Sequence, residues 1–265
     1  MLRPSLSPRL AFLGLTAALA MACGEQGDGA VTPGEDDRTL GDAQAEPPRA
    51  PQPASSDAGA ASDAAAATAV SLAERWLAFA EKRGAARGDL AIGIRGRDVH
   101  GVRHATRVGA KFDDTLIVVT GGTVTVFPVS THPFEKTSTT VPDVTADGKR
   151  DVAMIRPGLY RAVLRDASRN IGGALTYHVL STSGSDRIPA WRNTNQDDEY
   201  SDAEKSASVA RGDYATAILF HQAAASPPAQ GCQVMEPGSV AKLLPLLKDE
   251  FRYLLVDDGD DVPSL

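Results

Sequence analysis

Two side chains suited to nucleophilic catalysis stand eleven residues apart in the last fifth of the chain. The stretch ATAILFHQAAASPPAQGCQV, residues 215–234, carries His221 at the end of an apolar run and Cys232 directly after Gly231. A free thiol has a pKa of about 8.5, and a neighbouring imidazole can take its proton and leave a thiolate nucleophile. Because two prolines let the intervening segment double back, we expect the two side chains to meet. The alternative for His221 is a strand-end histidine held by backbone hydrogen bonds.

Cys232 has no evident disulfide partner. The chain contains two cysteines, and the other, Cys23, falls at a processing site near the N-terminus. An unpaired cysteine in an oxidising compartment is either a buried, inert thiol or a reactive one. Gly231 favours the reactive interpretation, because glycine lets a substrate approach the backbone closely. The amides of this loop would donate to a tetrahedral oxyanion, and we place Gln230 and Gln233 in the same oxyanion and substrate loop.

The N-terminus has the layout of a bacterial secretory signal over residues 1–23. Arg3 and Arg9 precede an apolar stretch, residues 10–20, and Cys23 follows it. The pattern resembles a lipoprotein signal, in which Cys23 becomes the lipidated first residue; the alternative is that Cys23 is removed or remains an ordinary thiol. The apolar stretch is shorter than the roughly 20 residues that span a bilayer. We therefore expect a cell-envelope protein, periplasm-facing or at the outer membrane, held by a lipid anchor.

Residues 24–68 form an acidic segment rich in Ala, Pro, Ser and Gly. They contain nine acidic and two basic side chains and account for most of the net charge of −7. Such a composition cannot bury a core and predicts a disordered tether. The remainder, residues 69–265, is close to neutral and lacks a basic stripe, which excludes nucleic acid as a partner.

Residues 69–265 are predicted to form one mainly β (α+β) domain with a helix at each end. Ser71 and Glu74 have the spacing of a capping box before an apolar helical stripe. A second helix is predicted from Ser239, interrupted at Pro245. Short runs rich in β-branched and aromatic residues predict strands between the helices, at 90–96, 115–129 with a Gly-Gly hairpin turn, 158–166, 174–180 and 215–221.

The order of the catalytic pair, with His before Gly-Cys, resembles the signature of the YkuD-type L,D-transpeptidases. The likeness covers about residues 215–235 and extends more loosely through DTLIVVTGGTVTVFPVST and IRPGLYRAV, which resemble strands of divergent, often phage-encoded relatives that also carry Gly-Cys-Gln. It implies a mixed β-sheet sandwich or barrel without metal or cofactor. His221 would be the base, Cys232 the nucleophile and Gly231 part of the oxyanion loop. Ala229 and Gln230 replace the Ser/Thr and second His of that signature.

The resemblance implies acyl transfer on peptidoglycan stem peptides. The thiolate would attack the carbonyl of an L-to-D peptide link and form a thioester, which an amine resolves as a cross-link and water resolves as carboxypeptidase trimming. The sequence does not choose between these outcomes. The interpretation from another class is a non-catalytic cell-envelope lipoprotein that binds a wall polymer or a protein partner.

Other candidate sites have simpler explanations. The stretch NTNQDDEYSDAE, residues 193–204, follows the spacing of a calcium loop but has Asp198 where that loop needs glycine, which favours a solvated acidic loop. His100 and His104 are four residues apart, yet they lie in a predicted loop without an evident third zinc ligand. His178 is predicted to be a strand residue. Four arginines could hold carboxylates of an acidic peptide or simply solubilise a loop: 95, 97, 103 and 107.

Overall fold

The computed structural model describes residues 70–265, except 137, 166–170, 172–173, 224–230 and 260. The predicted signal peptide with Cys23, the predicted tether 24–68 and the loop residue Gln230 lie outside the described residues. Within the described part of the chain, no helix is long and apolar enough to cross a membrane.

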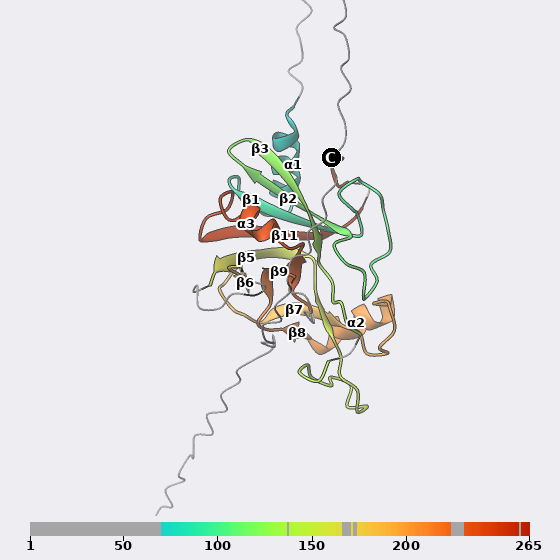
Figure 1. Ribbon diagram of the computed structural model, residues 1–265. Coiled ribbons are helices and arrows are strands. Elements are labelled where there is room, and N and C mark those ends of the chain that lie inside the picture. The colour runs from blue at the N-terminus through green and yellow to red at the C-terminus, as the bar shows by residue number, and fades with distance from the viewer. Residues whose placement is uncertain (1–69, 137, 166–170, 172–173, 224–230, 260) are drawn as a thin grey trace, which may run out of the picture. The chain divides into compact units, whose positions relative to one another are not determined.

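Eight strands close into a mixed β-barrel (Figure 1). In the order in which they pair, they are β1 (Leu90–Arg95), β11 (Glu250–Asp257), β5 (Gly158–Leu164), β6 (Tyr177–Ser181), β9 (Leu219–Gln222), β10 (Gln233–Met235), β3 (Thr123–Ser130) and β2 (Asp114–Thr120). The pairs β1–β11 and β9–β10 are parallel, and the other neighbours are antiparallel. The prediction of a mainly β domain built on a mixed sheet is confirmed.

The barrel interior is filled by alternate residues of these strands, as the period of two predicts. Four aromatic side chains form its centre: Tyr177, Phe220, Phe251 and Tyr253. The Phe220 ring meets the Tyr253 ring edge-on at 4.8 Å between centroids, and Tyr177 meets Phe251 at 4.9 Å. Each buried aromatic side chain stabilises the fold by roughly 2 kcal/mol, so this cluster holds β6, β9 and β11 together.

The predicted N-terminal helix is present as α1 (Leu72–Glu81), which packs next to β2 and β3. Trp76 is its central contact, fully buried with Ile92 and Leu254 against the outside of the barrel. The predicted capping box is half formed. The Ser71 hydroxyl accepts the Glu74 amide, whereas the Glu74 carboxylate forms an ion pair with Arg87 at 2.8 Å.

A second, smaller sheet of three strands shares the hydrophobic core of the barrel: β4 (Ala153–Ile155), β7 (Ile188–Arg192) and β8 (Tyr214–Ala215). The helix α2 (Asp202–Arg211), which the sequence analysis did not predict, packs along β7 (Figure 1). The predicted strand 215–221 is divided between β8 and β9, because Ala217 between them has a positive φ of 55° that no strand allows.

The predicted C-terminal helix is largely wrong. A short helix, α3 (Ser239–Leu243), begins where expected and ends before Pro245, and residues 250–257 form the barrel strand β11 instead. Phe251, Tyr253 and Leu255 of this strand face the barrel interior, which is an alternation of period two. The alternation is not visible in the sequence, because apolar residues follow one another without a break in this segment. The domain therefore has a helix at its N-terminal end and a strand, in place of the predicted helix, at its C-terminal end.

Candidate active site

His221 and Cys232 lie on the same face of two adjacent parallel strands. In the β9–β10 register, Val234 is the partner of His221 and Gln233 is the partner of Phe220. Phe220 faces the barrel interior, so His221 and Val234 face outward, as does Cys232 two residues before Val234. The register therefore places the two residues that the sequence analysis singled out on the same side of the barrel, but His221 Nε2 has no hydrogen-bond partner among the described residues and so makes no hydrogen bond with the Cys232 sulfur.

The two residues are diagonal neighbours on this outer face. With strands about 4.8 Å apart and a rise of about 3.3 Å per residue, their Cα atoms are separated by about 8 Å. Cys232 is 7% exposed and packs with Leu219 and Val234, so the sulfur belongs to a small apolar cluster on the outside of the barrel.

His221 has the protonation pattern of a general base. Its Nδ1 lies 2.8 Å from the carbonyl oxygen of Gln222. Since a carbonyl only accepts, Nδ1 carries the proton and Nε2 keeps its lone pair. Nε2 is buried and has no hydrogen-bond partner among the described residues. Burial lowers the pKa of His221, and the bond to Gln222, which acts in the opposite direction, does not offset it. The imidazole is thus neutral at neutral pH.

Gly231 is required by the backbone path into β10. Its φ is +120°, and a Cβ atom at this position would lie 2.7 Å from the carbonyl oxygen of Ala153 in β4. Only glycine fits there without moving backbone. Because residue 231 lies so close to the small sheet, this contact determines the backbone path that leads to Cys232.

Gln233 forms hydrogen bonds that hold Gly231 from the interior side of the barrel. It is fully buried, accepts a hydrogen bond from the Tyr253 hydroxyl at 2.6 Å and donates to the Gly231 carbonyl at 3.4 Å. The sequence analysis placed Gln233 in the oxyanion and substrate loop. Its side chain instead lies on the barrel side, opposite to Cys232, where it positions Gly231 without facing a substrate.

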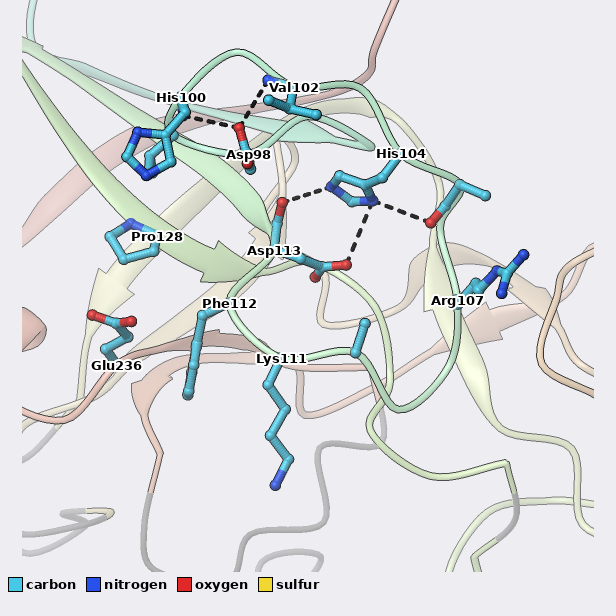
Figure 2. Close-up of a pocket in the computed structure, with 13 residues that line it drawn as sticks. Asp98, His100, Val102, His104, Arg107, Lys111, Phe112, Asp113, Pro128 and Glu236 are labelled. Carbon is cyan, nitrogen blue, oxygen red and sulfur yellow. Dashed lines mark hydrogen bonds and ion pairs between the residues drawn. The ribbon is translucent and has the colours of Figure 1, made fainter.

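A second polar cluster, which the sequence analysis missed, joins the ends of β2 and β3. The Asp113 carboxylate accepts a hydrogen bond from His132 Nε2 at 3.0 Å. The same carboxylate lies 3.5 Å from His104 Nδ1 (Figure 2). The His104 ring nitrogens contact two carbonyl oxygens, Ala105 at 3.1 Å and Asp113 at 2.6 Å. Both nitrogens must then donate, which requires an imidazolium.

The pKa shifts in this cluster have the signs of an ion pair. Burial alone would lower the pKa of His104, but its bonds to the two carbonyls and the charges of Asp113 and Asp114 raise it overall. Burial would likewise raise the pKa of Asp113, and the hydrogen bond and charge of His132 outweigh it, so that the pKa is lowered. The sequence could have predicted this site, because a hairpin over residues 115–129 places residues 113–114 beside residues 130–132.

His104, Asp113 and Asp114 together resemble a metal-ligand set, with ligand atoms within 4.8 Å of one another. The oxygen atoms that would bind a metal already accept hydrogen bonds, however. The two Asp114 oxygens accept the Gly96 amide at 2.7 Å and the Thr131 amide and hydroxyl at 2.9 and 2.7 Å. The group therefore acts as an internal hydrogen-bonded clamp, and metal binding would have to displace these bonds.

A cavity of about 710 Å³ opens beside this cluster (Figure 2). The loop 98–113 forms most of its wall, and Pro128 of β3 and Glu236, one residue after β10, complete it. Phe112 lines the cavity and also packs against the cluster that contains Cys232. Phe112 thus lies between the cavity and the apolar cluster of Leu219, Cys232 and Val234.

The acidic loop 193–204 uses its carboxylates internally. Glu204, in the last position of the calcium-like spacing, accepts the amides of Thr194, Asn195 and Ser201, and with Ser201 it forms a complete capping box for α2. Glu204 is therefore a buried capping residue, unlike the solvated side chain that the sequence analysis expected. This role also explains why the sequence pattern marks a helix start.

The four arginines of the predicted carboxylate-binding cluster meet acidic side chains of the chain itself. Arg95 pairs with Asp257 at 3.2 Å, Arg97 pairs with Asp258, and Arg103 pairs with Asp258 at 2.8 Å. The fourth, 107, approaches Glu199 at 4.0 Å. Three of these arginines therefore fasten the C-terminal end of β11 to the loop after β1.

The remaining histidines occupy different places. His178 lies in β6 as predicted, opposite Leu219 on the outer face, and burial, aided by the charge of Arg165, lowers its pKa. His100 lies in a loop, as predicted, and this loop lines the cavity.

Neither a scan with protein-family models nor a search of curated proteins gives a match.

Proposed function

We propose that the protein is a cysteine acyl transferase of the L,D-transpeptidase type that acts on peptidoglycan stem peptides. One observation carries the proposal. The His221 imidazole is fixed by the Gln222 carbonyl as a neutral ring with a bare Nε2, on the strand that pairs with the strand after Cys232. The mixed barrel is compatible with a YkuD-like fold. The resemblance of the N-terminus to a lipoprotein signal supports a place in the cell envelope, with an anchor at Cys23.

The proposed first half-reaction forms a thioester. Nε2 of His221 takes the proton of the Cys232 thiol, and the thiolate attacks the carbonyl carbon of an L-to-D peptide link. Loop amides around Gly231 would stabilise the oxyanion. When the C–N bond breaks, the amine of the leaving D-residue takes the proton back from Nε2, so protons and charge balance.

The second half-reaction releases the peptide. An amine or a water molecule attacks the thioester carbonyl, gives its proton to Nε2 of His221, and the Cys232 thiolate leaves and is reprotonated. An amine yields a cross-linked peptide and water yields a shortened one.

The test is a mass measurement on the full-length protein. We expect a carbapenem and an iodoacetamide reagent each to add one label at Cys232 at pH 7, and His221→Ala to slow this labelling at least tenfold. His178→Ala is the matched control, because this imidazole also lies on the outer face with an unpartnered, buried Nε2. If folded protein takes no label, the non-catalytic envelope lipoprotein becomes the better interpretation.

A further inference from the structure

The loop before β4 has the spacing of a calcium loop, which the sequence analysis did not single out. A calcium loop takes oxygen ligands from positions 1, 3, 5, 7 and 9 and needs glycine at position 6 for its sharp turn. In DVTADGKRD, residues 143–151, position 6 is Gly148 with a φ of +88°. Four of the other positions carry oxygen-bearing side chains: Asp143, Thr145, Asp147 and Asp151.

The first carboxylate of this loop has the loop backbone folded around it. Asp143 Oδ2 accepts the Gly148 amide at 2.8 Å, and its Oδ1 accepts the amides of Thr145 at 3.2 Å and Asp147 at 3.3 Å. Burial alone would raise the pKa of Asp143, but the hydrogen bonds from backbone amides, with Gly148 foremost, lower it overall. The side chain at position 1 is therefore an anion at neutral pH.

The ninth position holds a buried carboxylate with one unpartnered oxygen. Asp151 is fully buried, and its Oδ2 accepts the Val144 amide at 2.7 Å, which places the carboxylate beside the residue that follows Asp143. Its Oδ1 is buried and has no hydrogen-bond partner among the described residues. Burying a carboxylate oxygen without a partner is costly, and buried charges are as a rule paired or bound to a metal. This oxygen therefore indicates a ligand.

The charges around Asp151 favour a cation as that ligand. Burial raises the pKa of Asp151, and the nearby charges of Asp143 and Asp147 also act to raise it. The charge of Asp151 reaches Arg192 and Arg211. Within the described part of the chain, however, none of the three carboxylates forms an ion pair with an arginine or a lysine. A bound cation would remove the repulsion between the carboxylates.

The backbone at the end of the loop is fixed, whereas the carboxylates are still apart. The Asp151 amide donates to the Pro142 carbonyl at 3.0 Å, and its carbonyl accepts Arg192 Nη1 at 2.9 Å. The cluster at His104 is the one group of described acidic and histidine side chains with ligand atoms within 4.8 Å of one another. The loop carboxylates must therefore move closer to surround an ion, which the exposed Asp147 can do by rotating its side chain.

We propose that this loop binds one calcium ion through five oxygen ligands: the side chains of Asp143, Thr145, Asp147 and Asp151 and the carbonyl of Lys149. Water molecules complete the six to eight oxygens that calcium takes. Position 12, where many calcium loops have a bidentate glutamate, is Met154, buried in β4. The free Oδ1 of Asp151 supplies the carboxylate oxygen that this position lacks.

The ion would fix the start of β4, and it does so whatever the chemistry of the thiol is. Ala153 follows Asp151 by two residues, and its carbonyl oxygen is the atom that Gly231 approaches closely. Calcium bound at Asp151 would therefore stabilise the small sheet and the backbone that borders Gly231. The site does not depend on the proposed acyl transfer.

The experiment uses full-length protein that has been treated with a chelator and returned to chelator-free buffer. Equilibrium dialysis at constant ionic strength should give one bound calcium ion with a Kd of about 10⁻⁴ to 10⁻³ M, the range of extracellular calcium modules. Magnesium should bind at least about tenfold more weakly, because it demands near-ideal octahedral geometry. In calorimetry, 10 mM calcium should raise the Tm by about 3–10 °C.

Two substitutions in the loop and one outside it identify the site. Asp147→Asn and Asp151→Asn should each weaken calcium binding at least about tenfold and remove most of the Tm rise. Asp147 is exposed, so its variant keeps the test valid if the buried position does not tolerate asparagine. The matched control is Asp197→Asn in the loop 193–204, an exposed carboxylate that accepts the Glu199 amide at 2.8 Å. This control should bind calcium as the unmodified protein does.

Three results would overturn the assignment. The first is the absence of calcium binding. The second is binding that persists in both loop variants, which would place the ion on the acidic segment 24–68 or on the His104 cluster. The third is an equal loss in Asp197→Asn, which would indicate a general effect of acidic charge. Labelling of Cys232 reports separately on the proposed function, so either proposal can fail without the other.

Discussion

Two histidine sites, one on β9 and one at the ends of β2 and β3, show how the surroundings decide what an imidazole can do. At β9, one ring nitrogen of His221 meets a carbonyl and the other meets no partner among the described residues, which leaves a neutral base. At the ends of β2 and β3, both nitrogens of His104 meet carbonyls and carboxylates surround the ring, which favours the cation. Burial acts on both pKa values in the same direction, and the hydrogen-bond partners reverse the outcome only for His104.

The difference assigns separate tasks to the two sites. A neutral imidazole with a free lone pair can accept a proton from a thiol, whereas an imidazolium that donates twice has nothing left to accept with. The His104, His132 and Asp113 cluster fastens loops around the cavity. Under the proposed function, His221 is the group that accepts the proton of the thiol.

The largest effect should come from removing the reactive imidazole. We expect His221→Ala to reduce release of the terminal D-residue from an L-to-D peptide by about 10²- to 10⁴-fold, the usual contribution of a general base. His178→Ala should stay within about twofold. The measurement is single-turnover product formation, with circular dichroism to establish that both variants fold. Equal losses in the two variants would remove His221 from its assigned role.

Removing the Asp114 carboxylate from the hydrogen-bonded clamp should lower the free energy of unfolding. Asp114→Ala deletes a buried carboxylate that accepts from the Gly96 amide and twice from Thr131, and we expect a loss of about 3 kcal/mol in the free energy of unfolding. Asp98→Ala deletes a more exposed carboxylate that also accepts two amides and should cost about 1 kcal/mol. Urea unfolding compares the two, and equal losses would contradict the assignment of Asp114 as a buried clamp.

The close backbone contact directly before Cys232 can be tested by substituting Gly231. Gly231→Ala adds a Cβ atom that would lie 2.7 Å from the Ala153 carbonyl oxygen, whereas Gly122→Ala, also at positive φ, meets no atom within 4 Å. We expect the first substitution to destabilise by about 2 kcal/mol more than the second. Thermal unfolding of both variants gives the difference. A smaller loss at Gly231 would mean that the chain can shift there without cost.

The smallest effect is the pH dependence of stability, and the two histidines should contribute with opposite signs. Because the pKa of His221 is lowered by folding, its contribution is lost as pH falls below its usual value of 6.5. Because the pKa of His104 is raised, its contribution is complete below 6.5 and is lost as pH rises through the folded value. Urea unfolding between pH 5 and 8 should therefore be flatter at the acid end in His221→Gln and at the upper end in His104→Gln. The reverse assignment would contradict the comparison.

Local patterns in the sequence were sufficient for the parts of the fold that depend on neighbours in the chain. The Gly-Gly turn, the strands on either side of it and the helix after Ser71 were all predicted, since turn chemistry, alternation and capping act over a few residues. The helix α2 has the same local signal in the capping box of Ser201 and Glu204, but these two residues also belong to the calcium-like spacing of residues 193–204.

The proposed chemistry also rests on residues visible in the sequence: one histidine, one glycine and one cysteine, whose types and order resemble an acyl-transfer signature. Tertiary structure alone decided that β9 and β10 pair in parallel, that Gln233 faces the barrel while His221 and Cys232 face outward, and that Glu236 and Lys111 flank one cavity. Parallel pairing, inward or outward direction and the closing strand β11 depend on contacts between segments far apart in the chain, and a local pattern of residues contains no information about which distant strand will satisfy its hydrogen bonds.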